Sequence, residues 1–507
     1  MWCLSAIILL LAVPLRAAGA PPVLKVAART FAIYPQVGWP AASRTPQGVK
    51  EVIGDLKNTV VLLDYGSTRI CFVTSSLGIQ GGEVERGGLN IATRQVAAQA
   101  LGLSTDQIIL AGSHNHTVPT VGVDNPEEWG KPGAAPKDGV NEATRQFLEG
   151  LARTLKGLEK DLVPVTVEWG TAKETRVTYN RRGHRPNGKS YFIREEDRVK
   201  LGKDFVGEID PDASIVVFRK ENGIPAAAFA FFTGHPITGY NPENMVAFGQ
   251  WSQVASQKLS AHLGEIPVAF LQGCAGDINS KYLLTGTIQQ AIEMGGWLGD
   301  SYIEASKNLH RSERPGLQWS REKVKVPHGP LPPLADLEKD LASIDDFIRR
   351  GNAGDPNTLE CVGMNFPVAL TPAYRAKLVD MVRPWYVWAI EQHKTGKAGD
   401  VAKFLPMDIV VARIGDVGFV GLPFESFVRT GFKIKRETPL PCVLTCGYTG
   451  DTSGGTYGYI PDASAVNDRE YQAGFFRYMA KMPPYKAPAA DAAATVAVAK
   501  LTEYAKK

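Results

Sequence analysis

The tetrapeptide Ser-His-Asn-His at residues 113–116 is the feature that most constrains this chain. It follows a short apolar run, residues 107–112, which is rich in β-branched residues and is bounded by glycine, as is typical of a buried strand that ends in a loop. Residues two apart on an extended backbone point to the same side, so we expect His114 and His116 to face one spot. Because neutral imidazole is the commonest protein ligand for a metal ion, the pair indicates a candidate metal site.

The first twenty residues are typical of a secretory leader. Residues 4–12 form an apolar segment too short to span a bilayer with ease, and residues 18–20 are small, as a cleavage site requires. We therefore expect a signal peptide over residues 1–20 and a secreted or periplasmic protein whose folded part begins at residue 21. An uncleaved anchor is the alternative.

Composition describes an ordinary globular protein and excludes some partners. Of 507 residues, 44% are hydrophobic and 21% charged, and the net charge is only +4. No basic run is present, so nucleic acid is not a predicted partner. Five cysteines follow residue 20, and their spacing makes no zinc ribbon. We expect buried thiols with up to one disulfide.

Apolar runs and turns indicate a fold with many hairpins. Residues 164–169 and 175–179 are expected to pair with each other, and residues 268–271 form a short buried strand. Three further hairpins are expected between residues 59–64 and 69–74, 214–218 and 226–233, and 409–414 and 417–420.

Helical patterns lie between these strands, so we predict a mixed-sheet α/β (α+β) fold. Residues 326–340 and 352–358 are expected to be surface connections, and the Ala-rich segment 487–503 a peripheral helix. The predicted helices cover residues 90–101, 251–263, about 288–309 and about 372–393.

Polar residues stand at four predicted strand ends: the histidine pair, His235, the loop 272–277 and Glu425. Catalytic groups often lie on such loops. Each also has a structural interpretation: His235 could be a hydrogen-bonded core histidine, and Glu425 could cap a helix near Pro423. A site is indicated only if these pieces converge.

Five sequence blocks, in order and at similar spacing, resemble the catalytic domain of the neutral/alkaline (non-lysosomal) ceramidases. The resemblance covers roughly residues 25–480, and no counterpart of the family's C-terminal immunoglobulin-like domain is expected. The matching blocks are Gly112–Thr117, Phe232–His235, Gly273–Ser280, Pro423–Glu425 with Gly431, and Gly455–Ile460 with Tyr471.

The resemblance implies a ceramidase-like catalytic domain over residues 21–507, with a helical tail from about residue 487, and a bound zinc ion. Its four ligands would be His114, His235, Glu425 and Tyr459. It also implies that His116 contacts the substrate or the attacking water, that Arg181 lies beside the reacting carbonyl, and that Tyr471 donates a hydrogen bond.

The chemistry of these residue types agrees with that inference. Two imidazoles and a carboxylate form a zinc set with room for water. Zinc lowers the pKa of water and polarises a carbonyl, while a further imidazole can move the proton. The expected activity is zinc-dependent hydrolysis of an amide bond, on a small or lipid acyl-amide substrate such as a sphingolipid. A lipid substrate would bring the protein into peripheral contact with a membrane surface.

Departures from the family pattern concern the substrate side. Asn279 occupies the position of the family's catalytic serine, and an asparagine cannot act as acid, base or nucleophile. A second family motif is replaced by a different sequence that begins at Gln250. A smaller polar amide or ester is therefore as good a candidate as ceramide. Two alternatives stay open: a catalytically inactive ceramidase-like binding protein, and a metal-dependent esterase or phosphoesterase in which Asp277 would help to hold a second metal.

Overall fold

The computed structural model describes most of the chain. The described residues are 22–41, 48–77, 89–119, 121, 142–184, 190–192, 207–241, 244–450, 458–479 and 481–506. The expected signal peptide therefore lies outside them.

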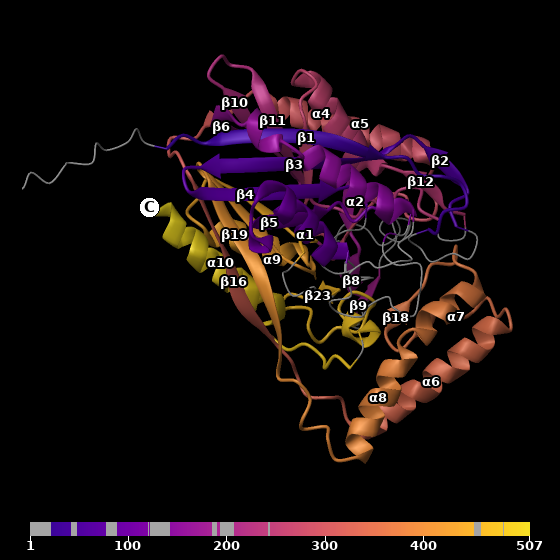
Figure 1. Ribbon diagram of the computed structural model, residues 1–507. Coiled ribbons are helices and arrows are strands. Elements are labelled where there is room, and N and C mark those ends of the chain that lie inside the picture. The colour runs from indigo at the N-terminus through magenta and orange to yellow at the C-terminus, as the bar shows by residue number, and fades with distance from the viewer. Residues whose placement is uncertain are drawn as a thin grey trace, which may run out of the picture.

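A nine-stranded mixed sheet forms the larger layer (Figure 1). Its order is β13-β11-β10-β6-β1-β3-β4-β5, and β15 pairs with β6. Only β4–β5 and β11–β13 run parallel. The strands are β1 (Lys25–Ile33), β3 (Leu56–Tyr65), β4 (Thr68–Ser75), β5 (Ile108–Gly112), β6 (Val163–Lys173), β10 (Asp212–Lys220), β11 (Pro225–Phe232), β13 (Val268–Gln272) and β15 (His310–Arg311).

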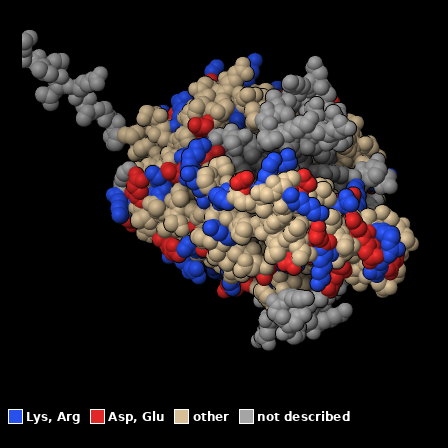
Figure 2. Space-filling model, turned by 90° about the horizontal axis from the view of Figure 1, so that it is seen from below, with Lys and Arg blue, Asp and Glu red and all other residues tan. Residues whose placement is uncertain are grey.

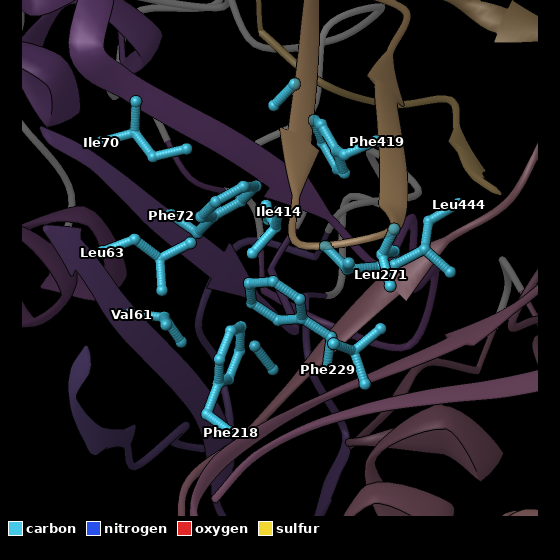
Figure 3. Packing of buried hydrophobic residues seen from close by; sticks show 14 of the residues in the cluster. Val61, Leu63, Ile70, Phe72, Phe218, Phe229, Leu271, Ile414, Phe419 and Leu444 are labelled. Atoms are coloured by element: carbon cyan, nitrogen blue, oxygen red, sulfur yellow. The ribbon is translucent and has the colours of Figure 1, made fainter. Parts of the chain in front are cut away.

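A four-stranded sheet packs against this layer. Its order is β16 (Leu317–Pro327), β19 (Phe404–Ile414), β20 (Val417–Gly421) and β22 (Cys442–Cys446). Apolar side chains from both sheets share one core, seen in Figure 3. Within it, the ring of Phe72 lies 4.9 Å from that of Phe229 and meets Phe419 edge-on at 5.1 Å. Such tilted aromatic pairs are favourable beyond the apolar area they bury.

Helices cover the outer faces of the sheets. Helices α4 (Gln250–His262) and α5 (Ile288–Ser306) share a buried cluster with β10, β11 and β13. Helices α6 (Leu334–Asn352), α7 (Pro372–Asp380) and α8 (Arg383–Lys394) form a group beside the sheets in Figure 1. The remaining helices are α1 (Leu89–Leu101), α2 (Glu142–Leu155), α9 (Val428–Glu437) and α10 (Ala489–Ala505).

The predicted α/β class is confirmed, and so are the three main hairpins. The pairing of residues 164–169 with 175–179 is wrong. Strand β6 instead pairs with β10 and β1, while β7 (Thr178–Asn180) pairs with β14 (Ile278–Ser280).

Two predictions about helices are also wrong. The single helix expected over residues 372–393 is split after Asp380, and α8 has Pro384 in its first turn. Proline lacks the amide proton that a continuous helix needs and disfavours helical geometry in the residue before it. The connections expected near 326–340 and 352–358 include residues 334–340 and 352 of α6, whose charged surface hides a buried stripe at Leu337, Ile344 and Phe347.

The C-terminal helix is not peripheral. The alanines of α10 are buried against β16 and β19, together with Leu501 and Tyr504. Alanine is small enough for a helix to approach a sheet closely, so a low aromatic content did not mean a solvent-facing position. The five described cysteines are buried and free.

Two properties of the surface bear on partners. Among the described residues, no helix is long and apolar enough to cross a membrane. Figure 2 shows basic and acidic side chains intermingled over one face of the molecule. That face offers no continuous basic surface of the kind that binds nucleic acid.

Candidate metal centre

Three histidines and a glutamate from distant parts of the chain meet at one buried point. The Nε2 atoms of His114 and His116 are 3.0 Å apart, and Glu425 Oε2 lies 3.2 Å from Nε2 of His114. The same carboxylate oxygen is 3.1 Å from Nε2 of His235. One nitrogen from each of the three histidines lies within 4.8 Å of the others. Donors bound at zinc distance in a tetrahedron stand about 3.3 Å apart, so this set fits such an ion.

The histidine pair faces one spot, as expected, but not for the expected reason. Strand β5 ends at Gly112, and His114 has φ of 60°, in the left-handed region. A non-glycine residue in this region costs energy and is held there by its surroundings. Here the ring of Tyr448 stacks on His114 with centroids 4.5 Å apart, and the Gly112 amide donates to the Tyr448 carbonyl.

His235 is oriented by its backbone. It follows β11, its amide donates to the Ile278 carbonyl, and its Nδ1 lies 3.0 Å from the same oxygen. Donation from Nδ1 leaves the lone pair of Nε2 directed at the centre, the arrangement typical of a metal-bound histidine. Burial, and then the nearby Arg181 cation, hold the pKa of His235 well below its usual range. The ring is therefore neutral, as a ligand must be.

Glu425 and Tyr459 are brought together by two short parallel strands, β21 (Glu425–Ser426) and β23 (Tyr459–Ile460), in which they are direct partners. Burial alone would raise the pKa of the Glu425 carboxyl. The imidazoles of His114 and His235 outweigh that effect and hold it well below its usual range. The Tyr459 hydroxyl is 3.2 Å from His235 Nε2, and burial raises its pKa.

Arg181 places a buried cation at this centre. Its guanidinium donates to the Tyr459 hydroxyl at 2.8 Å, to Asn279 Oδ1 at 3.0 Å and to the Gly276 carbonyl at 2.6 Å. It also lies 3.3 Å from His235 Nε2. Burial would lower the pKa of Arg181, but Tyr459 and Glu425 raise it. The arginine stays charged beside any negative oxygen that forms here.

The other expected residues lie around this centre. Asn279 contacts Arg181 rather than the imidazoles, and its Nδ2 donates to the Tyr179 hydroxyl at 3.4 Å. Tyr471 reaches the centre through ring contact with Tyr459, at 5.6 Å between centroids. The structure thus brings all eight expected site residues into one region. Asn279 and Tyr471 lie at its edge, where they contact Arg181 and Tyr459.

Asp277 does not point to a second metal. One of its carboxylate oxygens accepts from the Val428 amide at 2.7 Å and the other from Asn180 Nδ2 at 3.0 Å. It therefore caps α9, the role considered for Glu425. In the described part of the chain, the three histidines form the one group of acidic, histidine and cysteine side chains close enough to hold an ion.

Tyr448 is a site residue that the sequence analysis missed. Besides stacking on His114, its hydroxyl lies 3.5 Å from Glu425 Oε2. It follows strand β22, and its φ of 55° is left-handed like that of His114. The available signal was its place two residues after a strand end, the same kind of position that identified His235 and Glu425.

Two solved structures are similar to this fold. A neutral ceramidase from Pseudomonas aeruginosa matches with a TM-score of 0.60 at 15% sequence identity, over 96% of this chain and 75% of that chain. A ceramidase complexed with C2 matches with a TM-score of 0.63 at 16% identity, over 96% and 76%. No protein-family model and no curated protein matches the sequence. The similarity is therefore one of architecture, and the chain has a neutral ceramidase-like fold.

Proposed function

We propose that this protein is a secreted, zinc-dependent hydrolase of N-acyl amide bonds. The observation that carries the proposal is the convergence of His114, His235 and Glu425 on one buried point with donor atoms at ligand spacing. The ceramidase-like fold supports a hydrolase of this type. Secretion rests on the leader-like residues 1–20 alone.

The donor set suits zinc better than a hard cation. Two imidazoles and one carboxylate are a common catalytic zinc set, whereas Mg²⁺ and Ca²⁺ prefer all-oxygen sites. We assign His114, His235 and Glu425 as ligands, with Tyr459 as the fourth. When bound, zinc would supply Lewis acidity, which lowers the pKa of water and polarises the scissile carbonyl.

His116 is the residue to which we assign proton transfer. It is half-buried, whereas His114 and His235 are fully buried, so it is the imidazole that a substrate can approach. Its Nε2 stands 3.0 Å from that of His114, within reach of a proton on an attacking water. It would take that proton and pass it to the departing amine.

Arg181 is placed to stabilise negative charge on the carbonyl oxygen. Its guanidinium is buried and held by a 2.8 Å hydrogen bond to the Tyr459 hydroxyl, so its charge is fixed in position before the reaction begins. Preorganised donors in a water-poor site stabilise a developing oxyanion strongly. Asn279 accepts from Arg181 and would hold its guanidinium in place.

The substrate class is an acyl amide, and a sphingolipid amide such as ceramide is one candidate. A ceramidase is named in both structural matches. The amide side chain of Asn279, buried against Arg181, gives the site a neutral polar wall where the family has a hydroxyl. A smaller polar acyl amide would fit against this polar wall as well as ceramide would.

An activity screen tests the proposal. Chromogenic N-acyl and O-acyl substrates and a long-chain ceramide are incubated with the protein as prepared, after chelation, and after chelation followed by zinc. We expect amide hydrolysis that chelation abolishes and zinc restores. Zinc-loaded protein with no turnover on any substrate would identify a binding protein, and hydrolysis that survives complete metal removal would refute the metal assignment.

A further inference from the structure

A polar cavity lies apart from the histidine centre, between the large sheet and helix α4. Its volume is about 510 Å³, within the range of small-molecule pockets. Its walls come from β1, β3, β4 and β13 on one side and from α4 on the other. Serine and threonine make up more than half of its lining, and none of the proposed metal ligands contributes to it.

Most hydroxyl groups of this cavity already donate their proton to the protein. Ser256 donates to the Ser252 carbonyl at 2.9 Å, Ser260 to the Ile266 carbonyl at 2.6 Å, and Ser76 to Oε1 of Gln253 at 3.0 Å. A hydroxyl that donates in this way still has acceptor capacity on its oxygen. The walls therefore offer mainly acceptors, which suit a ligand rich in O–H donors.

Two hydroxyl groups in the wall have no partner. Ser113 and Ser252 are 4% and 1% exposed, and the Oγ atom of each has no hydrogen bond within the described part of the structure. Buried polar atoms are nearly always paired, so two unpaired hydroxyls on residues that line a polar cavity indicate that something polar fills it. These oxygens can both donate and accept.

The rest of the lining defines the ligand further. Lys57 and Glu265 contribute one charge of each sign, so the cavity has no net charge to match an ion. Phe270 and Val268 add an apolar patch to the wall, against which the C–H face of a ligand can pack. Hydroxyl oxygens on most sides, an apolar patch and neutral charge together describe a site for a sugar.

We propose that this cavity binds an uncharged polyhydroxylated ligand of monosaccharide size. Ser113 joins it to the catalytic region, because Ser113 lines the cavity and His114 is the next residue. A free sugar and the sugar headgroup of a glycolipid share this chemistry. The site is independent of the proposed zinc chemistry, since its lining contains none of the groups assigned to that reaction.

Calorimetric titration of the full-length protein with methyl and octyl glucoside tests the site. We expect binding of methyl glucoside. Equal binding of the octyl glycoside assigns the pocket to free sugars, and much tighter octyl binding assigns it to a glycolipid headgroup. Ser252→Ala, which removes an unpaired hydroxyl, should weaken binding about five- to tenfold. Ser256→Phe, which fills the cavity, should abolish it.

The control is Ser343→Ala, on the exposed face of α6, which should bind like the unchanged protein. Thermal melting shows whether Ser256→Phe folds, and Ser252→Ala removes too little to prevent folding. Absence of heat with both glycosides, or binding that Ser252→Ala and a folded Ser256→Phe leave unchanged, would overturn the proposal.

Discussion

The Nε2 atoms of His114 and His116 lie 3.0 Å apart although the backbone at His114 is left-handed, with φ of 60°. Side chains two positions apart on a strand would also point to the same face of the sheet. Here, however, the strand has already ended at Gly112. The turn at His114 lets that ring stack on Tyr448 while both nitrogens reach one point. Strain of this kind is concentrated at functional sites.

Loss of a proposed ligand should remove the metal. We expect His114→Ala and His235→Ala to reduce bound zinc from about one ion per chain to a trace and to lower hydrolysis by more than about 100-fold, because mutation of an outer-shell partner alone already costs about 10- to 100-fold. Elemental analysis measures the metal, and circular dichroism shows that the fold remains. His262→Ala, at an exposed histidine on α4, is the matched control. Full zinc content in both ligand variants would contradict the assignment.

His116 should behave differently from those two residues. If it moves the proton, His116→Ala keeps its zinc and loses about 10²–10⁴-fold in kcat, the usual contribution of a general acid or base. If its nitrogen is instead a ligand, as its distance to His114 would also allow, zinc content falls as in His114→Ala. Measuring metal and rate on the same preparation decides between the two roles.

The sequence predicted the pieces of the site better than their arrangement. The strand ends predicted at residues 112, 233 and 271 lie within one residue of those observed, because short apolar runs bounded by glycine are a local signal. Tyr448 was missed, since its relation to His114 is a contact between segments more than three hundred residues apart. The sequence also could not tell whether Asp277 or Glu425 caps α9, because that cap depends on tertiary packing.

Local signals were also insufficient for the helices. The apolar stripe of α6 is interrupted by so many charges that its first seven residues, 334–340, were expected to be a surface connection. Its buried face packs in one cluster with α7, α8 and apolar residues of the segment 361–366. Helical stability in proteins comes mostly from such packing.

Arg181 should contribute to the rate without holding the metal. Lysine keeps the charge but lacks the planar set of donors that reaches Tyr459, Asn279 and Gly276 together. We therefore expect Arg181→Lys to lower kcat about 10²–10³-fold, as loss of an oxyanion donor does, with zinc content unchanged. Arg176→Lys, at a half-exposed arginine nearby, should leave kcat unchanged. Equal kcat in the two variants would remove Arg181 from the catalytic set.

The carboxyl of Asp277 should make the fold less stable as the pH rises from about 4 to 6. Burial raises its pKa from 3.8 to about 6, although Arg182 and the Val428 amide oppose the shift. Between these values the folded state holds a proton that the unfolded state has lost, so the free energy of unfolding falls with pH. A shift of about two units corresponds to about 3 kcal/mol at most.

Asp277→Asn removes this titration while its Oδ1 can still accept from the Val428 amide. We expect the melting temperature of the unchanged protein, relative to that of Asp277→Asn, to decrease from pH 4 to pH 6 and then level off. Asp400→Asn, at an exposed carboxylate, should follow the unchanged protein across this range. Parallel curves for the unchanged protein and Asp277→Asn would show that the buried carboxyl is already ionised at pH 4, and that the Arg182 charge and the hydrogen bond from α9 outweigh the cost of burial.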